Sequence, residues 1–334
     1  MTSTAPALPT ELQVEVTGAC NLRCRMCLVR YRPALDRSTA SMDFATFRRL
    51  FDGLPGLRKV TLQGLGEPLM APDLVPMIRY AAAHGCRVGF NTNGTFLTRS
   101  RAAELVDAGL DWLHVSVDGA TAPTYEGIRG RAAFDRVAAN VVSLVEVLRE
   151  RRAERPTVCI VFVAQRSNIA ELPELVRLVG EWGVPELRVQ NLSHDFSDTG
   201  DDDGYLQIRD YAAAEALWFD RGDDGLAVLA EASRLAASLG VALRLPEEGD
   251  SGERRAAGTP GCDWPWRSAY VTYDAKVQPC CMVMGTERAV LGDASTHGVA
   301  GVWTSEQYVE FRQRLLGEDP PEVCRGCSMY RNVF

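Results

Sequence analysis

Three cysteines stand close together in the stretch Cys20-Asn21-Leu22-Arg23-Cys24-Arg25-Met26-Cys27. With three residues in the first gap and two in the second, three sulfur atoms can converge on one small inorganic group. A tetrahedral zinc ion would need a fourth ligand, and no Cys or His follows closely. The pattern therefore favours an iron–sulfur cluster with one open iron, because an open coordination position is typical of a catalytic site. From spacing alone, a zinc knuckle or a group of redox thiols remains the alternative.

This triplet, which follows an alternating apolar run, resembles the cluster motif of the radical S-adenosylmethionine (radical SAM) superfamily. The resemblance implies that Cys20, Cys24 and Cys27 hold a [4Fe–4S] cluster whose open iron binds S-adenosyl-L-methionine (SAM). The family usually has an aromatic residue directly before the third cysteine, where this chain has Met26. That position shields the cluster without ligating it, so the departure leaves the expected ligand set intact.

The composition is that of an ordinary soluble globular protein, since 46% of the 334 residues are hydrophobic and 24% are charged. The formal net charge of -8 disfavours nucleic acid or an anionic membrane as a partner. No apolar run approaches the roughly 20 residues that a membrane span needs, and residues 1–10 lack the features of an export signal. Ten cysteines in such a chain favour metal or redox use over disulfides, so we expect a cytoplasmic protein.

Segments with strand-like and helix-like patterns alternate through the first part of the chain, which is typical of parallel βα units. The expected strands cover residues 12–16, 59–63, 87–90, 112–117, 158–163 and 187–192. Ser41 is the expected N-cap of the first helix. These six units predict an α/β fold, a partial (β/α)6 barrel, as the resemblance also implies. Active sites of such barrels lie at the carboxyl ends of the strands, and the cysteine triplet follows the first strand.

Glycines and polar residues follow three further expected strands. The second strand ends in Gly64-Leu65-Gly66-Glu67, the third leads to Asn93, and the fourth ends in Ser116-Val117-Asp118 with Arg129 shortly after. The resemblance implies that the glycine-rich segment and its carboxylate hold the methionyl amine of SAM. It also implies that the serine and the arginine lie at the ribose or carboxylate. The expected SAM-binding residues are Gly64, Gly66, Glu67, Asn93, Ser116, Asp118 and Arg129. From the residues alone, plain turns, a helix N-cap at Ser116 and a surface role for Arg129 remain open.

A second group of cysteines lies near the end of the chain, at positions 262, 280, 281, 324 and 327. Residues 270–273 and 276–278 predict a hairpin that turns at Asp274-Ala275. Four thiolates from a hairpin and a terminal Cys-x-x-Cys pair can enclose one metal centre, and structural zinc is one such centre. The arrangement resembles the short twitch form of the SPASM extension, although that family usually has glycine where this turn has Ala275. The resemblance implies that Cys262, Cys280, Cys324 and Cys327 hold an auxiliary [4Fe–4S] cluster.

Four segments are expected from these patterns. They are an N-terminal tail at 1–10, the partial barrel at 11–192, a helical connecting region at 193–246 and a small α+β auxiliary-cluster domain of the twitch/SPASM type at 247–334. Within the third segment, residues 241–245 also predict a strand. We interpret residues 247–260, which are rich in Gly, Glu and Arg, as a linker.

The resemblance implies a radical SAM oxidoreductase that generates a 5′-deoxyadenosyl radical and removes a hydrogen atom from a strong C–H bond. An auxiliary cluster with four cysteine ligands has no open site, so its expected role is electron transfer. The nearest functional likeness is to the 2-deoxy-scyllo-inosamine dehydrogenases and related aminoglycoside and sugar enzymes of antibiotic biosynthesis. It implies that a small-molecule aminocyclitol or sugar is oxidised from a secondary alcohol to a ketone, with a flavodoxin or ferredoxin as electron donor.

No motif fixes the remaining catalytic residues. A dehydrogenase needs a base for the hydroxyl proton, and the candidates near late strands are Arg166, Arg188 and Arg244. A radical epimerase of the same architecture needs a hydrogen-atom donor, and the candidates are Cys281, beside a cluster ligand, and Cys159, on a barrel strand. Maturation of a ribosomal peptide is a third hypothesis. We weigh against it because such enzymes often carry a leader-binding domain, and only residues 1–10 precede the first strand here. A zinc-bound scaffold protein is the non-enzymatic alternative.

Overall fold

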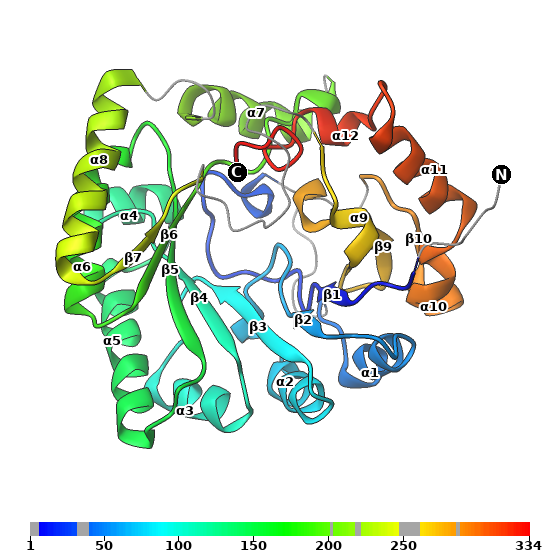
Figure 1. Ribbon diagram of the computed structural model, residues 1–334, viewed down its shortest axis with the longest axis horizontal. Coiled ribbons are helices and arrows are strands. Elements are labelled where there is room, and N and C mark those ends of the chain that lie inside the picture. The colour runs from blue at the N-terminus through cyan, green and yellow to red at the C-terminus, as the bar shows by residue number, and fades with distance from the viewer. Residues whose placement is uncertain (1–6, 32–39, 201–202, 218–221, 247–260, 285–287) are drawn as a thin grey trace.

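The structure is a computed structural model that describes residues 7–31, 40–200, 203–217, 222–246, 261–284 and 288–334. Its centre is a ten-stranded sheet with the strand order β10-β9-β8-β1-β2-β3-β4-β5-β6-β7 (Figure 1). The strands are β1 (Glu11–Val14), β2 (Lys59–Thr61), β3 (Arg87–Thr92), β4 (Trp112–Ser116), β5 (Thr157–Val163), β6 (Glu186–Gln190), β7 (Ala242–Arg244), β8 (Ser268–Val271), β9 (Lys276–Gln278) and β10 (Gly292–Asp293). Figure 1 shows β1 to β7 curving around a common centre, which makes an open, partial barrel.

Neighbouring strands from β1 to β7 are parallel, and β8 pairs parallel with the other side of β1. β9 and β10 continue the sheet in antiparallel orientation. The predicted α/β fold with a C-terminal hairpin is therefore confirmed. In the hairpin turn, Ala275 has φ 63°, a left-handed conformation that glycine adopts without strain.

The sheet extends beyond the six strands of the predicted barrel on both sides. Ala242 of β7 pairs with Glu186 of β6, inside the segment that the sequence predicted as a helical connecting region. Ser268 of β8 pairs with Glu11 of β1, so the C-terminal region joins the same sheet. These pairings satisfy backbone groups that would be unpaired at the edges of a six-stranded unit. The domain boundaries stay predictions, and the linker at 247–260 lies outside the described residues.

Helices connect the strands and cover the outer side of the sheet (Figure 1). They are α1 (Phe44–Asp52), α2 (Leu74–Ala83), α3 (Arg99–Asp107), α4 (Ala122–Arg129), α5 (Phe134–Arg151), α6 (Leu172–Glu181), α7 (Asp203–Glu215), α8 (Gly222–Leu239), α9 (Trp264–Arg267), α10 (Ala294–Trp303), α11 (Glu306–Leu316) and α12 (Glu322–Arg325). The predicted N-cap of the first helix is wrong. Asp43 caps α1 by accepting from Thr46 N at 2.7 Å, while Ser41 donates to Thr17 instead. No helix in the described part of the chain combines the length and apolar character that a bilayer span requires.

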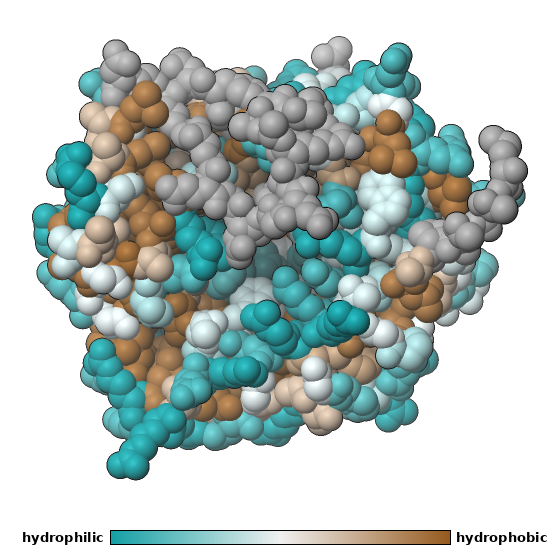
Figure 2. All heavy atoms as spheres, viewed as in Figure 1, coloured by the Kyte–Doolittle hydropathy of each residue, from teal (hydrophilic) through white to brown (hydrophobic). Residues whose placement is uncertain are grey.

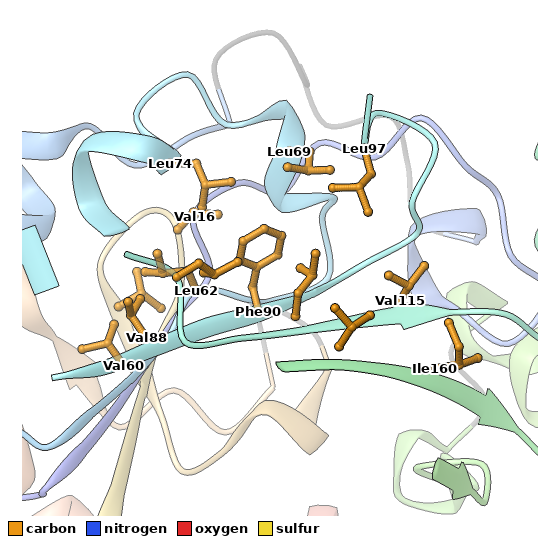
Figure 3. Close-up of a cluster of buried hydrophobic side chains, with 14 of the residues drawn as sticks. Val16, Val60, Leu62, Leu69, Leu74, Val88, Phe90, Leu97, Val115 and Ile160 are labelled. Atoms are coloured by element: carbon orange, nitrogen blue, oxygen red, sulfur yellow. The ribbon is translucent and has the colours of Figure 1, made fainter. Parts of the chain in front are cut away.

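Successive side chains along each strand point to opposite faces of the sheet, and the two faces differ in their surroundings. Val60, Val88, Val115 and Ile160 belong to the buried hydrophobic layer between sheet and helices that Figure 3 shows. Burial of each such side chain stabilises the fold by about 1.5–3 kcal/mol. The residues between them point to the opposite face, which is the inside of the barrel. The hydrophobic layer therefore fixes which polar side chains face the barrel centre.

Candidate active site

The loop that follows β1 carries the cysteine triplet and packs against α4. Arg25 N donates to Ile128 O at 2.9 Å, and Cys27 N donates to Cys24 O at 3.1 Å. The thiols of Cys20, Cys24 and Cys27 form no disulfide with one another or with another described cysteine. The loop thus presents three thiols at the carboxyl end of the first strand.

The three thiols have the chemistry of cluster ligands. Burial raises the pKa of Cys20 to about 11 and that of Cys27 to about 12, and it also raises the pKa of Cys24. A negative charge on Cys24 raises the pKa of Cys27 further, so the sulfurs lie close enough to affect one another. Among the described residues, no three Cys, His, Asp or Glu side chains are grouped as ligands of a single metal ion. Buried thiolates need positive charge beside them, and the irons of a cluster supply it, so the residues fit this group.

A buried ion pair lies beside Cys24. Arg129 Nη2 is 2.5 Å from Asp118 Oδ2, and Arg129 Nη1 is 3.9 Å from the Cys24 sulfur. Burial alone would lower the pKa of Arg129, but the charges of Asp118 and Cys24 hold that pKa above its usual value. Burial raises the pKa of Asp118, whose Oδ1 also accepts from Val163 N at 2.8 Å. A surface role for Arg129 is therefore wrong. Its guanidinium has a protein carboxylate as partner, where the resemblance implied the carboxylate of SAM.

Glu67 is held by three donors from the neighbouring chain segments. Its Oε1 accepts from Thr92 Oγ1 at 2.6 Å and from Leu69 N at 3.1 Å, and its Oε2 accepts from Asn93 N at 2.8 Å. Burial raises the pKa of Glu67, although these donors act in the opposite direction. A carboxylate offers about four acceptor sites, so one site remains for an ammonium group of a ligand.

The two glycines before Glu67 are required by contacts within the protein. A Cβ on Gly66 would lie 2.0 Å from Thr17 O and 2.7 Å from Ala19 O, both in the loop after β1. A Cβ on Gly64 would lie 2.2 Å from the Glu15 side chain. The sequence analysis attributed this segment to ligand binding, and the structure explains both glycines by the approach of the cysteine loop.

Gly66→Ala is expected to lower the free energy of unfolding by about 3 kcal/mol or more, because the clash involves backbone atoms that cannot rotate away. Gly56→Ala is the matched control, since a Cβ there would meet nothing within 4 Å, and its effect should stay within about 0.5 kcal/mol. Urea unfolding followed by circular dichroism measures both variants. Equal stability of the two variants would contradict the explanation.

Asn93 connects the third strand to the cysteine loop. Its Nδ2 donates to Asn21 Oδ1 at 3.0 Å and lies 4.0 Å from the Cys20 sulfur, while its Oδ1 accepts from Thr95 N at 2.9 Å. Ser116 is half-buried at the end of β4, the strand beside β3. The structure therefore brings the predicted SAM-binding residues together at the carboxyl ends of β1 to β4, around the cysteine triplet.

The four predicted auxiliary ligands line one small cavity. They are Cys262, Cys280, Cys324 and Cys327. Burial raises the pKa of each of these thiols, and it raises that of Cys262 to about 11. This donor set, like the first, fits an iron–sulfur cluster. Cys281 is not among the described residues that line this cavity, and its thiol lies next to the Gln13 side chain of β1.

A larger cavity of about 480 Å³ lies inside the open barrel. Figure 2 shows that the face of the molecule seen in Figure 1 is hollowed at its centre, among hydrophilic residues. Arg188 and Arg244 both line the cavity and hold Glu186 Oε1, at 3.0 Å and 2.9 Å. An arginine stays protonated in proteins, so this geometry favours charge binding over the predicted base role. Cys281 is not among the described residues that line the cavity.

The sequence analysis missed Arg87, Trp112 and His114, which line the same barrel cavity. The signal was present, because each alternates with an apolar residue along its strand and so faces the barrel centre. It also missed Met329, which together with Trp264 lines both the barrel cavity and the auxiliary-cysteine cavity. The two cavities are therefore neighbours that share part of one wall.

Two protein-family models match the chain in succession. The model described as the radical SAM superfamily matches residues 14–179. The SPASM model, described as an iron–sulfur cluster-binding domain, matches residues 262–328. The matched ranges contain both groups of predicted ligand cysteines.

Two curated relatives align along almost the whole chain. A tungsten-containing aldehyde ferredoxin oxidoreductase cofactor-modifying protein of Pyrococcus furiosus is 27% identical over 336 residues, which cover 95% of this chain and 87% of the relative. The PqqA peptide cyclase of Gluconobacter oxydans is 25% identical over 332 residues, which cover 97% of this chain and 84% of the cyclase. Both alignments therefore cover most of this chain and most of the relative.

Two solved structures share the fold. Streptococcus suis SuiB bound to the precursor peptide SuiA has a TM-score of 0.68 at 16% identity, covering 98% of this chain and 71% of SuiB. BtrN in complex with AdoMet and 2-DOIA has a TM-score of 0.53 at 17% identity, covering 96% of this chain and 94% of BtrN. At such low identities these likenesses show the fold alone.

Proposed function

This chain is a radical SAM enzyme with a SPASM domain, and we propose that its substrate is a peptide. The observation that carries the proposal is the alignment with a peptide cyclase over 97% of this chain and 84% of the cyclase. The expectation against a peptide substrate rested on the short segment before the first strand. An alignment that spans most of the cyclase outweighs that argument.

The secondary-alcohol dehydrogenase predicted from the sequence has weaker support. Its likeness to BtrN concerns the fold alone, and the two full-length relatives carry other names. The relative from Pyrococcus furiosus is named for modifying a cofactor, so small molecules belong in any substrate test. Oxidation of an aminocyclitol or sugar is therefore kept as an outcome of the experiment below.

We assign Cys20, Cys24 and Cys27 to the SAM-binding [4Fe–4S] cluster, and the four cysteines of the small C-terminal cavity to an auxiliary cluster. When bound, these groups and SAM supply a 5′-deoxyadenosyl radical and an electron-transfer centre. Arg129 holds a positive charge beside the Cys24 sulfur. The remaining acceptor site of Glu67 would accept a hydrogen bond from the ammonium group of SAM. The barrel cavity receives the substrate and keeps it out of bulk water.

The test is anaerobic incubation of the cluster-loaded protein with SAM, dithionite and one candidate substrate at a time. One panel holds peptides encoded by short reading frames beside the gene, and the other holds aminocyclitols and sugars. We expect release of 5′-deoxyadenosine that depends on a peptide, together with a change in the mass of that peptide. Reactions without SAM are the control. Conversion of an aminocyclitol to a ketone, with every peptide unchanged, would overturn the proposal in favour of the dehydrogenase.

A further inference from the structure

The barrel cavity carries positive charge although the chain as a whole is negative. Five cationic side chains line it, at positions 59, 87, 188, 244 and 267, against one side-chain carboxylate among the lining residues, at position 186. The formal net charge of the chain is -8, so overall composition does not explain this concentration of cations. The local arrangement of charges needs its own explanation.

Two of these arginines share a single carboxylate oxygen. Glu186 Oε1 lies 3.0 Å from Arg188 Nη2 and 2.9 Å from Arg244 Nε. Arg188 Nε is buried and has no hydrogen-bond partner among the described residues. Each guanidinium group carries five N–H groups. A single carboxylate that two arginines share therefore cannot accept hydrogen bonds from all of these donors. Arg188 therefore has donors left for an anion in the cavity.

The remaining cations lie near the rim of the cavity and are weakly paired. Glu11 is 3.7 Å from Lys59 and 3.9 Å from Arg267, and Asp263 is 3.5 Å from Arg267. These pairs are partly exposed and long, so each contributes little. Arg87 is exposed and pairs with no carboxylate in the parts of the chain that the structure describes. A positive surplus is left at the entrance as well as inside.

The positive charges around the cavity also affect the pKa of His114. It faces the cavity beside Trp112, with their ring centroids 4.6 Å apart. Burial and the charges of Arg188 and Lys59 lower the pKa of His114 to about 4, although Glu186 opposes them. The imidazole is therefore neutral near pH 7, and the cavity disfavours a further positive charge.

The cavity begins at the amino-terminal ends of β2 to β6 and extends along β6 toward the predicted SAM site. Ser116 of β4 pairs with Val161 of β5, and Val161 pairs with Arg188 of β6, so the three residues form one row across the sheet. Two strand spacings separate the ends of this row, which is about 10 Å. A group held by Arg188 would thus lie within about 10 Å of Ser116, one of the residues that we assign to SAM.

We propose that the barrel cavity binds an anionic group of the substrate, with Arg188 inside and Arg87 at the rim as its contacts. Resting on the proposed peptide function, the inference identifies that group as the carboxylate of an Asp or Glu side chain near the reacting residue. A guanidinium fork binds a carboxylate through two parallel hydrogen bonds, which also fixes its orientation. Arg188 and Arg87 are thereby specificity-determining residues.

Binding to the anaerobic, cluster-loaded protein tests this inference without turnover. The probes are acetylated tetraglutamate amide, the corresponding tetraglutamine peptide and inorganic phosphate, each titrated by calorimetry. We expect tetraglutamate to bind at least about tenfold more tightly than tetraglutamine, since charge-assisted hydrogen bonds contribute about 1.5–3 kcal/mol. Arg188→Gln and Arg87→Gln should each weaken tetraglutamate binding by about fivefold or more. Arg79→Gln, an equal change of charge on the exposed side of α2, should leave it unchanged.

Equal binding of the two peptides would overturn the inference, and so would an equal loss of affinity in Arg79→Gln. Arg87 is exposed, so its variant keeps the test valid even where Arg188→Gln fails to fold. Phosphate bound with the same dependence on Arg188 and Arg87, while tetraglutamate fails to bind, would support an anion site and count against the peptide as substrate. Failure of the inference and failure of the proposed function are thus separate results.

Discussion

Replacing Cys24 by alanine is expected to abolish SAM cleavage and to leave the auxiliary iron in place. The Cys24 thiol is buried, lies 3.9 Å from Arg129 Nη1 and is close enough to Cys20 and Cys27 to shift their pKa values. Two thiols cannot hold the cluster that three are placed to bind. We expect 5′-deoxyadenosine formation to fall to the level of a protein-free reaction, and bound iron to fall from about eight to about four per chain.

Two matched variants make this result specific. Cys86 is equally buried but donates to Leu57 O at 3.3 Å on another part of the sheet, so Cys86→Ala should keep both the iron and the activity. Cys327→Ala should lose the other half of the iron and keep the SAM-binding cluster. Iron and acid-labile sulfide analysis with electron paramagnetic resonance follows both clusters. Unchanged SAM cleavage in Cys24→Ala, or an equal loss of iron in Cys86→Ala, would show that the ligand assignment is wrong.

Local patterns were sufficient to predict most of the barrel. The strands alternate regularly, so Val60 and Val88 could be assigned to the core, and the cysteine triplet could be placed at a strand end. Pairing between distant segments was not predictable in the same way. β7 and β8 join the sheet at opposite edges, through contacts that no local period encodes. The first helix cap was missed at short range, because Asp43 and Ser41 are both good N-cap residues and only the helix start decides between them.

In the candidate site, too, the sequence predicted which residues make close contacts but not which groups they contact. A glycine at position 66 signals a close approach, but the sequence could not reveal that the approaching group is Thr17 O and not a ligand. Likewise, Arg129 was assigned to a carboxylate, and the structure gives it the carboxylate of Asp118. The barrel cavity was missed because its cations come from strands far apart in the chain. Residue types thus predict the kind of interaction, and the fold selects the partner.

Arg129→Met is expected to be the most destabilising single substitution of a charged residue in this site. It would leave the fully buried Asp118 carboxylate without its cation. Breaking a buried pair by removing one partner costs about 3–5 kcal/mol, because an uncompensated charge stays in a medium that solvates it poorly. For a chain of this size we expect the midpoint of thermal unfolding to fall by about 6–12 °C. Differential scanning fluorimetry of the cluster-loaded protein measures the change.

Two controls distinguish the destabilisation caused by the unpaired Asp118 carboxylate from the effect of removing an arginine as such. Arg99 pairs with Glu146 at 3.2 Å on the surface, where its side chain is 48% exposed, so Arg99→Met should cost less than about 1 kcal/mol. The double variant Asp118→Asn/Arg129→Met removes both charges and keeps an oxygen that can accept from Val163 N. It should recover most of the lost stability, because replacing a whole buried pair is often nearly neutral. If the double variant were as unstable as Arg129→Met, the loss would come from the packing of Arg129 and not from the unpaired carboxylate.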